Sequence, residues 1–113
     1  MLEDYARVIE QQDVTVAVCN AVIVGVLVLG QTDEGFRIIS VAVHPSFQKQ
    51  GLGRTLLRLA ETKAVGRGHE SIHLATHETM VENQALYAKI GYVEYDRRIE
   101  DGYSRVFMRK RLV

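Results

Sequence analysis

Apolar residues recur at intervals of three or four in three parts of the chain, the spacing that places side chains on one face of an α-helix. The helices predicted by this pattern span residues 2–11, 52–65 and 81–90. The residues expected to form the buried face of the middle helix are Leu52, Leu56, Leu59 and Ala60. Glycines at positions 66 and 68 end this helix, because glycine commonly follows the last helical turn.

Six other segments alternate apolar and polar residues or are dense in Val, Ile and Thr, which is typical of β-strands. The predicted strands span residues 14–18, 21–29, 36–43, 71–76, 92–98 and 104–110. The two-residue break Cys19-Asn20 joins the first two strands into a hairpin, with a bulge expected at Gly25. Pro45 ends the third strand, and the turn Glu100-Asp101-Gly102 joins the last two strands into a second hairpin.

The order of these elements predicts a mixed sheet. The strand at residues 38–43, the helix after it and the strand at residues 71–76 form a βαβ unit, so these two strands should be parallel. The hairpins on either side should be antiparallel. The sequence therefore predicts a single α/β (α+β) domain over residues 1–113, with a mostly antiparallel sheet around one central parallel pair.

Composition narrows the class of protein. The 113 residues carry no formal net charge, so the chain is not expected to bind nucleic acid or a membrane surface. Cys19 is the only cysteine, which excludes an intrachain disulfide and suits a reducing compartment. The uncharged stretch at residues 14–30 is too short for a convincing membrane span, and the N-terminus is acidic where a signal peptide is basic. We therefore expect a cytoplasmic protein.

Residues 48–53 carry the most specific signal in the chain, a Gln-x-x-Gly-x-Gly turn between a strand and a helix. Such a turn presents free backbone N–H groups and the positive end of the helix dipole, which together bind phosphate. The turn is neither a P-loop, because Arg54-Thr55 follows Gly53, nor a dinucleotide fingerprint, because Leu56 replaces the third glycine. Taken alone, the pattern is equally consistent with a ligand-binding loop and with an ordinary turn in which Gly51 and Gly53 serve only the backbone.

This turn resembles the acetyl-CoA signature of the GNAT acetyltransferase superfamily. Two neighbouring segments are similar to the same family: residues 38–45, which resemble its central strand, and residues 83–92, which resemble its Asn, Tyr and Gly-aromatic signature. A third likeness is the terminus at residues 108–112. The resemblance covers roughly residues 14–112, and it implies a GNAT-like mixed sheet with helices on both faces.

The resemblance also implies roles for individual residues. The glycine turn would hold the pyrophosphate of acetyl-CoA, the backbone of the central strand would pair with the pantetheine arm, and the Val43 N–H would polarise the acetyl carbonyl. The implied cofactor-binding residues are Val41, Val43, Gln48, Lys49, Gln50, Gly51, Leu52, Gly53, Arg54 and Asn83. Tyr87 would be the catalytic acid that protonates the departing thiolate, since its pKa of about 10 keeps it protonated at neutral pH. Taken alone, Tyr87 is better explained as a core aromatic, because it shares a helix surface with Leu86 and Ile90.

The chain departs from the family pattern in two places. It begins at what resembles the second helix, so the usual first strand is expected to come from a partner chain, to have been lost, or to lie outside the given sequence. A homodimer that covers the open sheet edge is one expectation. Many relatives carry a Glu as general base where this chain has Ile39 and Ser40. The sequence offers four candidates for the general base and does not choose among them: His73, His77, Glu78 and Glu82. A base is not needed if the amine arrives partly neutral.

The string His-Glu-x-x-His at residues 69–73 matches a zinc-protease motif, but we expect no metal there. The motif works on a helix, whereas these residues run into a predicted strand, where positions four apart lie about 13 Å from each other. The sequence therefore predicts an N-acetyltransferase that moves an acetyl group from acetyl-CoA to a small-molecule or peptide amine. The alternative is a catalytically silent acyl-CoA-binding or interaction module of the same fold.

Overall fold

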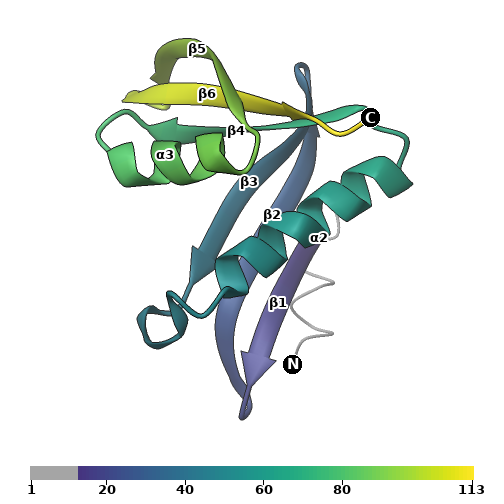
Figure 1. Ribbon diagram of the computed structural model, residues 1–113, viewed down its shortest axis with the longest axis vertical. Coiled ribbons are helices and arrows are strands. Elements are labelled where there is room, and N and C mark those ends of the chain that lie inside the picture. The colour runs from purple at the N-terminus through teal and green to yellow at the C-terminus, as the bar shows by residue number, and fades with distance from the viewer. Residues whose placement is uncertain (1–12) are drawn as a thin grey trace.

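The computed structural model describes residues 13–113 and contains one six-stranded sheet with two helices (Figure 1). The strands are β1 (Asp13–Cys19), β2 (Val22–Thr32), β3 (Gly35–Val43), β4 (Ser71–His77), β5 (Val93–Glu100) and β6 (Tyr103–Arg111). The helices are α2 (Leu52–Gly66) and α3 (Val81–Lys89), and a short 3-10 turn spans Pro45–Phe47. The helix predicted over residues 2–11 lies outside the described residues.

The sheet has the strand order β1-β2-β3-β4-β6-β5. Every neighbouring pair is antiparallel except β3 and β4, which are parallel, so the predicted βαβ unit and mixed sheet are confirmed. The last strand, β6, lies between β4 and β5. No local pattern predicted this insertion, because it depends on pairing between strands that are distant in the sequence.

Both hairpins form, with small shifts from the predicted boundaries. The first turn consists of Asn20 and Ala21, not Cys19 and Asn20, and both turn residues have positive φ, as a two-residue hairpin turn requires. The expected bulge lies beside Gly25, where the pairing of β1 with β2 skips Val24. Glycine at position 25 also lets α2 approach the sheet, because an added Cβ would lie 3.2 Å from the side chains of two α2 leucines.

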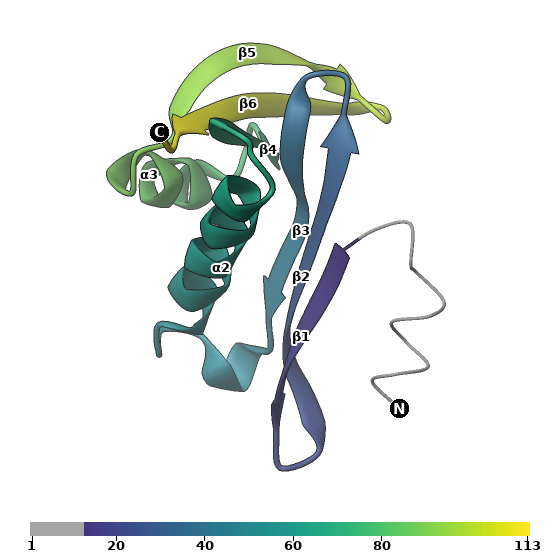
Figure 2. The same ribbon diagram turned by 90° about the vertical axis from the view of Figure 1, so that its right-hand side faces the viewer.

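The core lies between the sheet and the two described helices, which share one face of the sheet (Figure 2). Helix α2 buries Leu56, Leu57, Ala60 and Ala64, whereas the predicted Leu52 and Leu59 are only partly buried at its margin. The core residues from the sheet are Leu27, Leu29, Phe36, Ile38, Ile72, Leu74, Val106 and Met108. No helix within residues 13–113 is long and apolar enough to cross a bilayer.

Tyr92 differs from its prediction as the first residue of a strand. Strand β5 begins one residue later, and Tyr92 packs in the core with only 1% of its surface exposed. Its hydroxyl donates a hydrogen bond to Glu61 on α2 (3.2 Å), and Glu61 also pairs with Lys110 on β6 (2.9 Å). Burial and the neighbouring Glu61 carboxylate raise the pKa of Tyr92 far above its usual value. This side chain therefore joins α2 to the end of the α3 segment.

Candidate functional site

The sheet opens between its two parallel strands. Strands β3 and β4 pair at only two positions, Arg37 with His73 and Ile38 with Leu74. Beyond Ile38, β3 continues to Val43 and pairs only with β2 among the described strands. The pairing of β2 with β3 skips Ile39, which forms a bulge at the point where the gap begins.

The backbone of β3 turns hydrogen-bonding groups toward this gap. His44 N–H donates to the Val24 carbonyl of β2 (2.7 Å), so the groups of the preceding residue, Val43, point toward the opposite edge. Consistent with this direction, the Val43 carbonyl accepts a hydrogen bond from the Gln48 side chain (3.2 Å). By the same alternation, Val41 also turns its N–H and carbonyl toward the gap. The edge of β3 can therefore pair with an extended ligand.

A groove of about 460 Å³ fills the gap and is lined by residues from both faces of the sheet. Its lining residues are Ile38, Ile39, Ser40, Val41, Leu74, Ala75, Thr76, His77, Thr79, Met80, Asn83, Tyr87 and Arg105. A second pocket of about 250 Å³ lies at the start of α2. Its lining residues are Val41, Val43, Gln48, Lys49, Gly53, Arg54, Leu57, Asn83, Leu86 and Tyr87.

The two cavities share Val41, Asn83 and Tyr87, so they adjoin along β3 and α3. Together they form a channel that runs from the start of α2 into the gap in the sheet. The channel brings eight of the residues predicted from the sequence to one place, namely Val41, Val43, Gln48, Lys49, Gly53, Arg54, Asn83 and Tyr87.

The three remaining predicted residues, Gln50, Gly51 and Leu52, build the turn that starts α2. Gly51 is the N-cap with φ of 85°, a conformation that favours glycine, and it makes no side-chain cap. The first helical hydrogen bond is from Thr55 N–H to the Gly51 carbonyl (3.0 Å), so the N–H groups of residues 52–54 have no acceptor within the helix. The Gln50 side chain donates to the Ser46 carbonyl (3.3 Å) and holds the turn in place.

Tyr87 lies where the two cavities meet. Its ring contacts Tyr92 edge to face, with the centroids 5.9 Å apart, and it packs against the core. Its hydroxyl makes no hydrogen bond to any residue from 13 to 113, and burial raises its pKa above the usual value. Tyr87 is therefore both a core aromatic and a protonated hydroxyl beside the channel.

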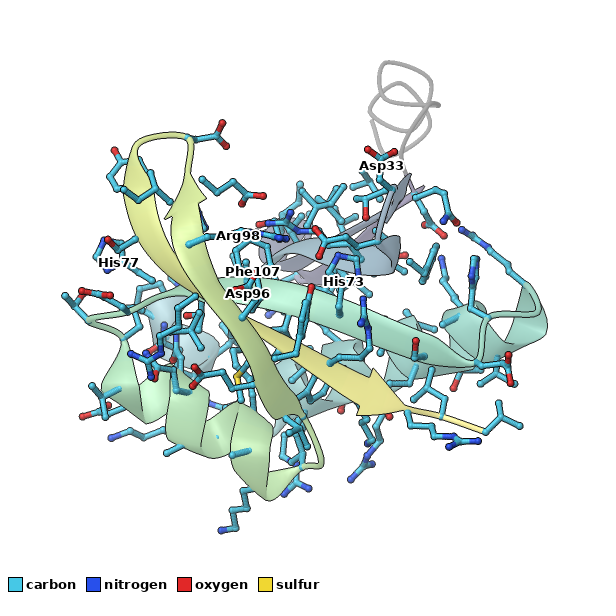
Figure 3. All side chains as sticks on the ribbon, turned by 90° about the horizontal axis from the view of Figure 1, so that it is seen from above. Asp33, His73, His77, Asp96, Arg98 and Phe107 are labelled. Atoms are coloured by element: carbon cyan, nitrogen blue, oxygen red, sulfur yellow. The ribbon has the colours of Figure 1, made fainter. Side chains whose placement is uncertain are left out.

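The structure separates the four general-base candidates. His77 lines the groove, whereas His73, Glu78 and Glu82 do not. His73 is 1% exposed on the same strand, and Figure 3 shows the two histidines well apart along β4. Burial, followed by the charges of Arg109 and Arg37, lowers the pKa of His73.

The ring of His77 has one nitrogen engaged. Its Nδ1 accepts a hydrogen bond from the Thr79 backbone N–H (3.2 Å), so in the neutral ring the proton lies on Nε2. His77 therefore offers a donor from Nε2, and it becomes a base only if the contact with Thr79 is released.

The His-Glu-x-x-His segment is extended, as predicted. His69 precedes β4 and stacks on Phe36 with ring centroids 4.7 Å apart, while His73 lies within β4, with its Nε2 3.4 Å from the Thr32 hydroxyl. Within residues 13–113, no three His, Cys, Asp or Glu side chains are grouped to hold a metal ion.

Sequence reasoning missed several residues that line the channel, above all Arg105. Arg105 pairs with His77 across β6 and β4, so its place in the groove follows from the insertion of β6 beside β4. Leu57, Thr76, Thr79, Met80 and Leu86 also line the channel and were not singled out. Leu86 lies within the signature at residues 83–92, whereas the other four belong to no motif identified in the sequence.

Solved structures place this fold among acetyltransferases. The chain is 26% identical to an acetyltransferase from Bacillus subtilis solved in complex with CoA, with a TM-score of 0.78. The alignment covers 98% of this chain and 84% of that one. The chain therefore shares its fold with a solved acetyltransferase.

Comparison of sequences identifies the family. Residues 2–92 match the Acetyltransferase (GNAT) family, and the chain belongs to it. It is 32% identical over 92 residues to an acetyltransferase of Pectobacterium atrosepticum, covering 76% of this chain and 65% of that protein. It is 35% identical over 69 residues to an uncharacterised N-acetyltransferase of Bacillus subtilis, covering 60% and 44% respectively. The matched segments therefore span less than two thirds of either curated relative.

Proposed function

We propose that this protein is an N-acetyltransferase that transfers the acetyl group of acetyl-CoA to a small-molecule or peptide amine. The observation that carries the proposal is the channel from the glycine turn of α2 into the gap between β3 and β4. Membership of the GNAT family supports acetyl transfer, and the Bacillus subtilis relative solved with CoA supports the choice of cofactor.

The pyrophosphate of acetyl-CoA would bind at the start of α2. Three N–H groups, at residues 52–54, are free there, and the helix dipole adds positive potential. Lys49 and Arg54 line the same pocket and contribute positive charge. The pantetheine arm would then extend along β3, where Val41 and Val43 turn their backbone groups toward the gap.

The chemistry needs no covalent intermediate on the protein. The neutral amine attacks the thioester carbonyl, a C–N bond forms, and the C–S bond breaks to release CoA. The Val43 N–H would stabilise the charge that develops on the carbonyl oxygen. Tyr87 would give its proton to the sulfur, and the attacking nitrogen would lose one proton to water, or to His77 once its contact with Thr79 is released.

The first test is thermal unfolding with acetyl-CoA, CoA, ATP and NAD in parallel. A ligand present at 100 times its dissociation constant stabilises the folded state by about 2.7 kcal/mol. For a domain of this size, that raises the unfolding midpoint by roughly 10 °C or more. We expect this shift with acetyl-CoA and CoA only, followed by acetylation of an amine in a screen of acceptors.

Two glycine variants make the test specific to the turn. Gly51 and Gly68 both have φ of 85° and no atom within 4 Å of an added Cβ, and they lie at opposite ends of α2. A β-branched residue is strained at such a φ, so Gly51→Val and Gly68→Val should both lower stability. Only Gly51→Val should weaken CoA binding, by at least tenfold. Equal CoA affinity in the two variants would contradict the proposed phosphate site.

A silent acyl-CoA-binding module remains the alternative function. It shares the glycine turn and the β3 edge, so it predicts the same thermal shifts with CoA. It differs in predicting no acetylated product with any amine. Replacement of Tyr87 by Phe also separates the two functions, because only an enzyme has turnover to lose.

A further inference from the structure

Arg105 lies at the end of the groove away from the helices. It is on β6, where Val106 and Met108 face the helical core, so Arg105 faces the opposite side of the sheet. His77 is its partner on β4, and both line the groove. Tyr87 lines the same groove from α3 on the helical side. The groove therefore passes through the sheet, with Tyr87 at one mouth and Arg105 at the other.

The guanidinium of Arg105 is incompletely paired. The nearby Glu100 carboxylate gives both oxygens to Arg37, at 2.8 Å each, and Arg105 Nε is 3.5 Å from the nearer oxygen. That Nε is buried and has no hydrogen-bond partner within residues 13–113. A buried donor without a partner costs free energy that a bound acceptor group would recover.

Arg37 also has a buried, unpartnered Nε, but its situation differs. Its two terminal nitrogens are both occupied by Glu100, and it does not line the groove. The Arg105 side chain donates no hydrogen bond within residues 13–113, and its ion pair there is the 3.5 Å contact with Glu100. Arg105 is therefore the guanidinium that remains available to a ligand in the groove.

The rest of this mouth also favours an anion. The described residues that line the groove include no Asp or Glu. His77 adds a second donor, because its Nδ1 is engaged by Thr79 and its Nε2 carries the proton. A polyamine, an aminoglycoside or a lysine-rich peptide would meet two donors here, and the nearby Glu100 carboxylate is already bound by Arg37.

We infer that the amine acceptor carries a carboxylate, which Arg105 binds while the amine reaches the thioester. This inference rests on the proposed acetyl transfer and names the substrate class of that site. A planar guanidinium binds a carboxylate through two parallel hydrogen bonds, a geometry that lysine does not offer. Because Glu100 already offsets part of the positive charge of Arg105, the site favours a monoanion over a phosphate dianion. The acceptor class is thus the amino acids and related amino carboxylates.

The test compares acceptors that differ only in the carboxylate. The twenty amino acids, β-alanine and 4-aminobutyrate are assayed against the corresponding amides, with spermidine as a polycation. The amides have the more neutral amine at pH 7.5, so amine reactivity alone would favour them. We expect at least a tenfold higher kcat/KM for one or more amino carboxylates than for their amides. Thermal unfolding with CoA present provides a second readout, as an additional shift from the carboxylate form only.

Two arginine variants on β6 test whether the preference for carboxylates comes from the Arg105 side chain. Arg105→Gln should raise KM for the preferred amino carboxylate at least tenfold, so that the preference over the amide falls by a similar factor, while KM for acetyl-CoA stays the same. The control is Arg111→Gln, an exposed arginine on the same strand that does not line the groove. It should change none of these values.

Each outcome decides the inference. If amides or spermidine are acetylated with the same kcat/KM as the carboxylates, the inference is wrong while acetyl transfer stands. The same conclusion follows if KM for the amino carboxylate is unchanged in Arg105→Gln. Failure of acetyl-CoA and CoA to raise the unfolding midpoint would instead overturn the proposed function. A carboxylate-dependent shift that Arg105→Gln removes would still support the anion site in that case.

Discussion

Tyr87 and Tyr92 provide a matched pair of substitutions that separates catalysis from stability. Their rings lie 5.9 Å apart, and both lie against the same core. Replacement by Phe removes one hydroxyl in each case and keeps the ring. The Tyr92 hydroxyl donates to Glu61, whereas the Tyr87 hydroxyl has no partner among residues 13–113 and faces the channel. The two variants should therefore have opposite effects.

The magnitudes follow from these contacts. A hydrogen bond to a charged group contributes about 1.5–3 kcal/mol. Glu61 keeps its pair with Lys110, so the loss in Tyr92→Phe should be near the lower end, about 1.5 kcal/mol. At about 4–8 °C per kcal/mol, the unfolding midpoint should fall by roughly 6–12 °C. Tyr87→Phe loses no protein hydrogen bond, so its stability should stay within about 0.5 kcal/mol of the wild type.

Activity should respond in the reverse order. A general acid contributes about 100-fold to 10,000-fold in rate, and a thiolate leaves readily, so Tyr87→Phe should lower kcat by about 100-fold. Its affinity for CoA should not change, because the ring remains in the channel. Tyr92→Phe should keep kcat at a temperature well below its unfolding midpoint. Steady-state kinetics, CoA titration and thermal unfolding of the two variants provide the comparison.

Three results would each contradict part of this reasoning. If Tyr87→Phe keeps the wild-type kcat, Tyr87 is a core aromatic only and another group protonates the thiolate. If wild type and both variants bind CoA and none makes product with any amine, the silent-module alternative leads. A loss of stability in Tyr87→Phe equal to that of Tyr92→Phe would show that its hydroxyl has a structural partner.

Two further predictions concern pH. Burial, followed by nearby arginine charges, lowers the pKa of His73, so the unfolded chain takes up a proton first and stability should fall as the pH drops below about 6.5. Between pH 5 and 7, His73→Gln should reduce the slope of the unfolding midpoint against pH. The control His44→Gln replaces an exposed histidine and should leave that slope unchanged. Equal slopes in the two variants would contradict this account. Burial alone would raise the pKa of Asp13, but the hydrogen bonds and charges of Lys63 and Arg67 outweigh it and lower the pKa. That stabilisation is present above about pH 4 and is lost on acidification. Asp13→Asn should therefore lower the free energy of unfolding by about 1 kcal/mol at pH 7 and by less at pH 3. An equal loss at both pH values would disprove the pairing.

The features predicted well are those that depend on neighbours in the sequence. The glycine turn that starts α2, the two hairpins and the βαβ unit each arise from a short stretch of chain. Their residues specify a turn, a period or a helix start without help from the rest of the fold. The boundaries moved by one to three residues, as at Tyr92, which lies before β5 and donates a hydrogen bond to Glu61.

The sequence by itself therefore determined the family, the order of the described elements and the glycine turn that starts α2, because those signals lie in contiguous residues. Only the tertiary structure decided which candidate base lines the groove and which arginine stands opposite Tyr87. His77 was singled out over His73 because β4 diverges from β3 after two paired positions, and Arg105 because β6 lies beside β4. Both facts follow from strand pairing between distant segments, and a linear pattern of side chains carries no record of such pairing.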